Sequence, residues 1–250
     1  MSTAIPFSRT APAAPSRAAS SLPARVVGVL RAPRSTFAAL ARTPRWADVL
    51  ALTCAIAFLA AASFLNTEVG RLALLDQMER TAVAFGQQVD EAGYAGFVRA
   101  SEHGTGYAAL VALAIGPVLA LGVALLLYFI FTRRGGGHAT YRQVLAITAH
   151  AGVILALRQL LVAPLNYARE TLASPLTLSL FWTTLDEASP LARFFGAVDL
   201  FVLWWAASLA LGIAVLYERR TRSLVMAFVG SYVALAALLA LSMALAGGAA

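Results

Sequence analysis

Long runs of hydrophobic residues alternate with short polar segments along most of the chain. Five runs approach or exceed the roughly 20 helical residues needed to cross a bilayer core of about 30 Å. They lack the alternation of barrel strands, and lipid forces backbone polar groups to pair within the protein. We therefore predict an all-α integral membrane bundle of five transmembrane helices, with spans at residues 47–65, 107–132, 144–163, 196–217 and 223–246.

Two segments outside these runs show amphipathic helical periodicity. Residues 25–45 place Val26, Val29, Leu30, Phe37 and Leu40 on one side, with Arg31, Arg34 and Arg42 facing away. This pattern predicts an amphipathic cytoplasmic helix before the first span, which either lies on the inner leaflet or packs against the cytoplasmic face of the bundle. Similar spacing after residue 66 predicts an extracytoplasmic helix that continues from the first span.

The remaining polar segments define the domain organisation. Residues 1–24 are rich in Ala, Pro and Ser, which predicts a disordered cytoplasmic tail. The basic amphipathic segment at 25–45 follows, and then the five-span membrane domain at 46–248. Residues 174–185 are apolar but too short to span, so they form an interfacial or a re-entrant segment.

Charge sets the orientation of the bundle. All 19 basic residues are arginines, a usage typical of a GC-rich bacterial genome, and the formal net charge is +7. Most arginines precede span one or lie between spans two and three and spans four and five, which places the N-terminus inside and the C-terminus outside. This distribution favours a membrane surface over nucleic acid as the partner. Arg31, Arg34, Arg42 and Arg45 are predicted to contact the anionic inner leaflet.

Three ionisable residues fall within the predicted spans: His150, Arg158 and Asp199. Such groups are costly in a membrane and suggest a specific role. We expect Arg158 and Asp199 to form a pair that joins spans three and four near the outer interface. The alternatives for Asp199 are a helix cap or a substrate or ion site, and His150 is expected to bond a neighbouring helix.

The sequence favours no catalytic, metal or cofactor site. Cys54 is single, and the glycine run after Arg134 lacks the Lys and Ser or Thr of a phosphate loop. Small residues such as Ser208 and Gly212, four positions apart, instead predict close helix packing. Trp204 and Trp205 are expected to pack between helices.

Four features resemble the bacterial branch of the YIP domain family, the Ypt/Rab-interacting membrane proteins. They are APRSTFAALARTPRW, TYRQVLAI at the start of span three and VDLFVLWW leading into the glycine-bearing span four, and the fourth feature is the set of five spans with the tail inside. The resemblance covers residues 25–245 and implies a multi-pass membrane protein without known catalysis, whose eukaryotic relatives act through Rab GTPases. The positions that match those kept in the family are Pro33, Phe37, Asp199, Phe201, Trp204 and Gly212.

These observations predict a non-enzymatic scaffold or adaptor for membrane proteins or lipids in a bacterial inner membrane. A Rab-type GTPase is disfavoured because a bacterium has no Rab system. The alternative is transport, as an accessory subunit of an export complex or as a small permease. The scarcity of polar groups in the spans disfavours a charged substrate.

Overall fold

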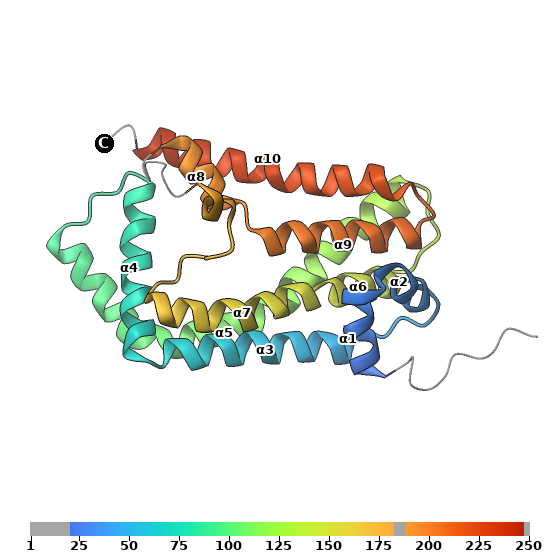
Figure 1. Ribbon diagram of the computed structural model, residues 1–250, viewed down its shortest axis with the longest axis horizontal. Helices are drawn as coiled ribbons and strands as arrows, with labels where there is room; N and C mark the ends of the chain where they lie inside the picture. The colour runs from blue at the N-terminus through green and yellow to red at the C-terminus, as the bar shows by residue number, and fades with distance from the viewer. Residues whose placement is uncertain (1–20, 183–188, 248–250) are drawn as a thin grey trace, which may run out of the picture.

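In the computed structural model, residues 21–182 and 189–247 are described, and these are helical except for short connections (Figure 1). Residues 1–20 of the predicted tail and 183–185 of the predicted interfacial segment lie outside this part. The elements are α1 (Leu22–Arg31), α2 (Pro33–Arg42), α3 (Ala47–Leu65), α4 (Glu68–Ala84), α5 (Glu91–Tyr128), the π-helical turn η2 (Phe129–Arg134), α6 (Tyr141–Ala151), α7 (Val153–Arg169), the 3₁₀ turn η3 (Leu178–Phe181), α8 (Pro190–Ala197), α9 (Leu200–Leu216) and α10 (Thr221–Gly247).

The long helices run side by side, with α1 and α2 at one end of the bundle and α4 across the other (Figure 1). Four stretches of the described helices are long and apolar enough to cross a membrane: Ala47–Leu65, Leu113–Arg134, Tyr141–Arg169 and Thr221–Ala246. Helix α9 is equally apolar but has 17 residues, below the length of the other four. The structure thus supports an all-helical protein with four candidate spans and one shorter apolar helix.

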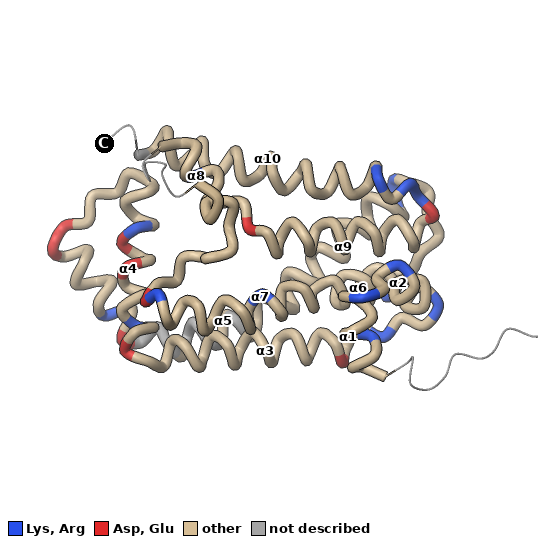
Figure 2. Tube along the Cα trace, in the orientation of Figure 1, with Lys and Arg blue, Asp and Glu red and all other residues tan. Residues whose placement is uncertain are grey.

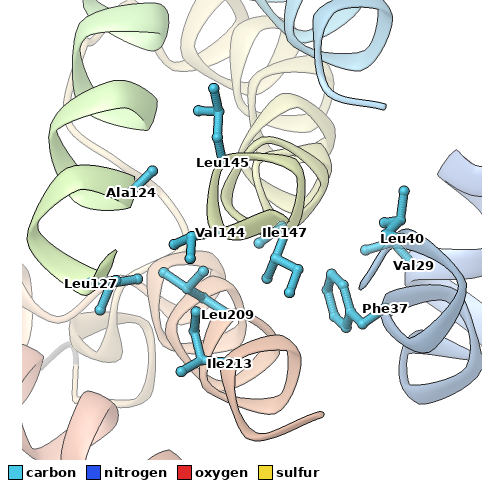
Figure 3. Packing of buried hydrophobic residues seen from close by; sticks show 11 residues of the cluster. Val29, Phe37, Leu40, Ala124, Leu127, Val144, Leu145, Ile147, Leu209 and Ile213 are labelled. Atoms are coloured by element: carbon cyan, nitrogen blue, oxygen red, sulfur yellow. The ribbon is translucent and has the colours of Figure 1, made fainter. Parts of the chain in front are cut away.

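Helices α6 and α7 form the centre of the bundle. Of the most apolar stretch in Tyr141–Arg169, 61% is buried, against 11% for Thr221–Ala246. Thr140 and Gln143 form a capping box that fixes the start of α6, and the Gln143 side chain also donates to the carbonyl of Ala41 at 2.6 Å. The core around α6 is built from Val29, Phe37, Leu40, Ala124, Leu127, Val144, Leu145, Ile147, Ala151, Leu209 and Ile213 (Figure 3).

The basic amphipathic segment is two helices rather than one. Pro33 begins α2 and disfavours helical geometry at Ala32, so α1 ends at Arg31. Phe37 is fully buried and points toward Ile147 of α6 (Figure 3). The apolar side of the segment therefore packs against the bundle, as the second of the two sequence-based alternatives proposed, and is not free to insert into a leaflet.

Helix α4 does not continue from α3, which corrects the sequence-based expectation. The chain turns at Asn66, and the Thr67 hydroxyl caps α4 by accepting from the Gly70 amide at 3.0 Å. A Cβ atom at Gly70 would lie 2.1 Å from the Phe64 carbonyl oxygen, so only glycine permits the tight turn. As a result α4 lies across the end of the bundle (Figure 1).

Helix α7 ends in a strained backbone conformation, which gives a first testable prediction. Glu170, its C-cap, has φ of 53°, the left-handed region in which a side chain costs about 1 kcal/mol. Glu170→Gly is expected to raise the free energy of unfolding by about that amount. Thermal unfolding of the purified protein in detergent measures it. Glu170→Ala is the control, because it removes the carboxylate but keeps the strain; an equal gain there would contradict this explanation.

Candidate functional site

A polar cluster lies where α9 begins, among otherwise apolar helices. Arg158 of α7 donates from Nε to Oδ2 of Asp199 at 2.8 Å, and the side chains are 20% and 9% exposed. Ser174, from the connection after α7, accepts from Nη2 of Arg158 at 3.0 Å and donates to the same Asp199 oxygen at 2.8 Å. The structure therefore brings the two predicted residues together and adds a third side chain between them.

Asp199 is also the N-cap of α9. Its Oδ1 atom accepts from the backbone amides of Phe201 at 2.8 Å and Val202 at 3.3 Å, groups that have no partner within the helix. On sequence, pairing with Arg158 and capping a helix were alternative roles for Asp199. In the structure the two carboxylate oxygens divide these roles, with Oδ2 facing Arg158 and Oδ1 facing the helix.

The segment before η3 is held against the start of α9 by backbone bonds. Thr177 and Asp199 form an isolated antiparallel bridge. The amide of Leu200 donates to the carbonyl of Leu176, and that of Leu178 to Val198, each at 2.9 Å. Residues 174–178, from the connection between α7 and α8, therefore lie beside the cluster.

Tyr232 of α10 completes the cluster. Its hydroxyl accepts from the Asp199 amide at 2.9 Å and donates to the Ala197 carbonyl at 3.1 Å. The cluster thus joins α7, the α7–α8 connection, α9 and α10. Sequence reasoning missed Ser174 and Tyr232 because a serine and a tyrosine beside apolar runs are common. The only signal for them in the sequence is that each side chain carries a hydroxyl group beside or within an apolar run.

The tyrosine gives a second prediction. Tyr232→Phe removes one acceptor and one donor while keeping the ring, and is expected to lower the free energy of unfolding by about 1 kcal/mol, the scale of hydrogen bonds between membrane helices. Thermal unfolding in detergent tests this. Tyr167→Phe is the matched control, because Tyr167 is 53% exposed and should give no measurable change. Equal effects of the two variants would count against a role for the Tyr232 hydroxyl.

The cluster lies far from the end of the bundle that holds Tyr141 and Tyr217. At 1.5 Å per residue, the helix from Tyr141 to Arg158 and the helix from Asp199 to Tyr217 each rise roughly 25 Å. The two charges therefore meet at the same level, because α6 begins and the antiparallel α9 ends at the same end of the bundle. Both oxygens of the carboxylate already accept donors from the protein, and these bonds link α7, the α7–α8 connection and α9.

A second ion pair, between a buried arginine and an exposed carboxylate, lies at the opposite end of the bundle. The Arg25 guanidinium of α1, 6% exposed, pairs with Asp48 in the first turn of α3. In the sequence, Arg25 was counted only among the arginines that precede the first span and set the orientation. The available signal was Asp48, an acid within an arginine-rich stretch.

His150 is fully buried in α6. Its Nδ1 atom lies 2.8 Å from the carbonyl oxygen of Ala146, one turn earlier in the same helix. Nε2 has no hydrogen-bond partner among residues 21–182 and 189–247. The expected bond to a neighbouring helix is therefore not found in this part of the chain, where the histidine bonds its own helix.

The residues that match the family pattern lie at helix starts and contacts. Pro33 is the first residue of α2, and Phe37 packs at Gly212 of α9, where an added Cβ would lie 3.2 Å from the ring. The ring centroids of Phe201 and Trp204 are 5.7 Å apart. Trp204 is 40% exposed, so the expectation that it packs between helices is wrong. Trp205 packs partly buried against the core.

The apolar helices and the ion pair between α7 and α9 are those of a multi-helix membrane protein. The family model described as Yip1 domain matches residues 27–244, and the chain belongs to this family. No curated protein and no solved structure matches the chain.

Proposed function

We propose that the protein is a non-enzymatic scaffold or adaptor in a bacterial inner membrane, which holds a membrane-protein partner beside it. The observation that carries this proposal is the uneven burial of the spans. Only 11% of the most apolar stretch is buried in α10, and the same share in Leu113–Arg134, against 61% in α6 and α7. Two helices therefore present most of their apolar side chains outward, where lipid or another protein covers them.

In this proposal α9 is the fifth span, and each end of the bundle is assigned to one side of the membrane. Its rise of roughly 25 Å is near the 30 Å of the hydrocarbon core, and 17 residues is the lower limit for a span. Arginines gather at the end with α1, α2 and the α9–α10 turn, while α4 at the other end carries acids and arginines together (Figure 2). By the positive-inside rule the N-terminus is cytoplasmic and the C-terminus extracytoplasmic. Reporter fusions at residues 21 and 247 should then report opposite compartments.

The cytoplasmic end contacts the anionic inner leaflet. Since the apolar side of α2 is occupied by the bundle, this contact is electrostatic. Arg31, Arg34, Arg42 and Arg45 are exposed and carry it. A juxtamembrane arginine is worth roughly 1 kcal/mol at an anionic surface.

Copurification from native membranes tests the scaffold role. The expected result is one membrane protein recovered in a fixed ratio with the full chain. Gly230 of α10 has no atom within 4 Å of an added Cβ, so a neighbouring helix can approach closely there. Gly230→Leu should reduce recovery of a partner bound at α10, and Gly122→Leu, at an equally open glycine, recovery of a partner bound at α5, so each variant is the control for the other face. Recovery of the chain without any partner would contradict the proposal.

Transport is the second candidate, favoured by the polar cluster itself. Helix α9 starts inside the apolar bundle at a charged pair, and helices of transporters often break at their substrate sites in this way. Solute flux through the purified protein in liposomes, abolished by Arg158→Leu, would establish it and exclude a purely structural role for the cluster.

A further inference from the structure

A pocket of about 330 Å³ lies between α2 and the turn from α9 to α10. Helix α2 is held in place on one side by Phe37 at Gly212 and on the other by the Gln143 bond to the Ala41 carbonyl. The pocket is therefore a fixed feature of how α2 docks. It is lined by Arg34, Ala38, Ala214, Val215, Glu218, Arg219 and Thr221.

The lining combines small apolar residues, here called the floor, with charged and polar residues, here called the rim. Ala38, Ala214 and Val215 are small and apolar, so they leave room for a glycerol or acyl portion. The rim includes Arg34, from α2, and Arg219, from the α9–α10 turn. Nη2 of Arg219 also donates to the Gly135 carbonyl at 3.4 Å, a long bond that leaves its other N–H groups for a ligand. Guanidinium groups match phosphate oxygens with two parallel donors each, which makes arginine the preferred residue for this anion.

The rim is also polar beyond the two arginines. Thr221, the first residue of α10, offers a hydroxyl, and Glu218 offers an acceptor. With two guanidinium groups and one carboxylate, the formal charge of the rim is positive by one unit. This matches the single negative charge of a phosphodiester, and the carboxylate can accept from a hydroxyl of the headgroup.

We propose that this pocket binds the headgroup of an anionic phospholipid, of the phosphatidylglycerol type, from the inner leaflet. The assignment rests on the proposed cytoplasmic position of this end of the bundle. Arg34 and Arg219 hold the phosphodiester, Glu218 accepts from the glycerol hydroxyls, and the alanine floor contacts the glycerol backbone. The site differs from the diffuse attraction of the other arginines because it is a shaped cavity formed by three segments.

Native mass spectrometry of the detergent-purified full chain, titrated with short-chain phosphatidylglycerol, tests the proposal. Arg34→Gln with Arg219→Gln should weaken binding by about tenfold for each guanidinium removed. The matched control is Arg142→Gln with Arg222→Gln, which makes the same charge change at exposed positions outside the pocket and should bind nearly as the wild type does. Phosphatidylcholine, which has no net charge, should bind more weakly.

A second variant separates the pocket from its charge. Ala38→Phe fills the floor without changing any charge and should also weaken phosphatidylglycerol binding. Thermal unfolding of each variant shows that it is folded. If Ala38→Phe binds as the wild type does, the lipid does not occupy the pocket and the proposal fails.

Three outcomes distinguish the ways in which the idea can fail. If the pocket and control pairs lose binding equally, the contact is diffuse; the pocket proposal fails while the leaflet contact stands. If neither pair loses binding, both fail. If inorganic phosphate displaces the lipid at equal concentration, the site takes free phosphate and the assignment to a phospholipid is overturned.

Discussion

Replacing Asp199 with asparagine is expected to lower the free energy of unfolding by about 3–5 kcal/mol, the cost of leaving a buried charge without its partner. Asparagine keeps an oxygen for the cap of α9, so the loss reports the charge rather than the helix start. Arg158, with a side chain 20% exposed, would then stay charged among apolar helices with only Ser174 beside it. Thermal unfolding and the yield of folded protein in detergent measure the effect.

The pairing itself is tested by a double variant and a surface control. Arg158→Leu with Asp199→Asn removes both charges and should recover most of the stability lost in Asp199→Asn alone, because no buried charge remains. Asp76→Asn breaks the exposed pair with Arg80 on α4, whose side chains are 45% and 61% exposed, and should cost less than about 1 kcal/mol. Additive losses in the double variant would show that the two residues do not act as a pair.

The contact at Gly212 gives the second large effect. A Cβ atom there would lie 2.4 Å from Cγ2 of Ile147, and the Phe37 ring closes the other side. Gly212→Leu cannot be accommodated without moving α2 or α6 away from α9, and is expected to cost about 3 kcal/mol or more. The shift should also loosen α2, which protease sensitivity of the segment between α2 and α3 would report.

Two comparisons separate packing from helix propensity. Gly230→Ala, in an exposed position of α10 with open space around it, should be neutral or slightly stabilising because alanine favours helix. Gly212→Ala with Ile147→Ala removes the Cγ2 atom that an added methyl would meet, and should be less destabilised than the sum of the two single variants. A loss at Gly230 as large as at Gly212 would mean that any glycine replacement harms this protein.

Much of the helical layout could be predicted from hydrophobic runs, because burial in lipid requires length and apolarity over consecutive residues. The runs at 47–65 and 223–246 correspond closely to α3 and to Thr221–Ala246 of α10. The run at 196–217 was less informative. It includes α8 residues and the Asp199 cap, and the helix that results has 17 residues. Apolarity alone does not show where a backbone breaks inside such a run.

The cluster around Asp199 was only half predictable. Two charges within apolar runs indicate each other because both are costly alone, and so Arg158 and Asp199 could be paired on sequence. Ser174 and Tyr232 could not, since hydroxyl groups cost little and occur throughout such sequences. Asp48 was overlooked for a different reason: beside many arginines its partner cannot be chosen by proximity along the chain.

A bundle of apolar helices with an arginine-rich end can be predicted from composition and hydrophobic pattern, because lipid solvation and the positive-inside rule act on local composition. The tertiary structure alone decided that α2 turns its apolar side to the bundle, that Gly212 admits both Phe37 and Ile147, and that four segments meet at Asp199. These features depend on which surfaces fit each other in three dimensions. Residues distant along the chain share no local pattern that encodes such a fit.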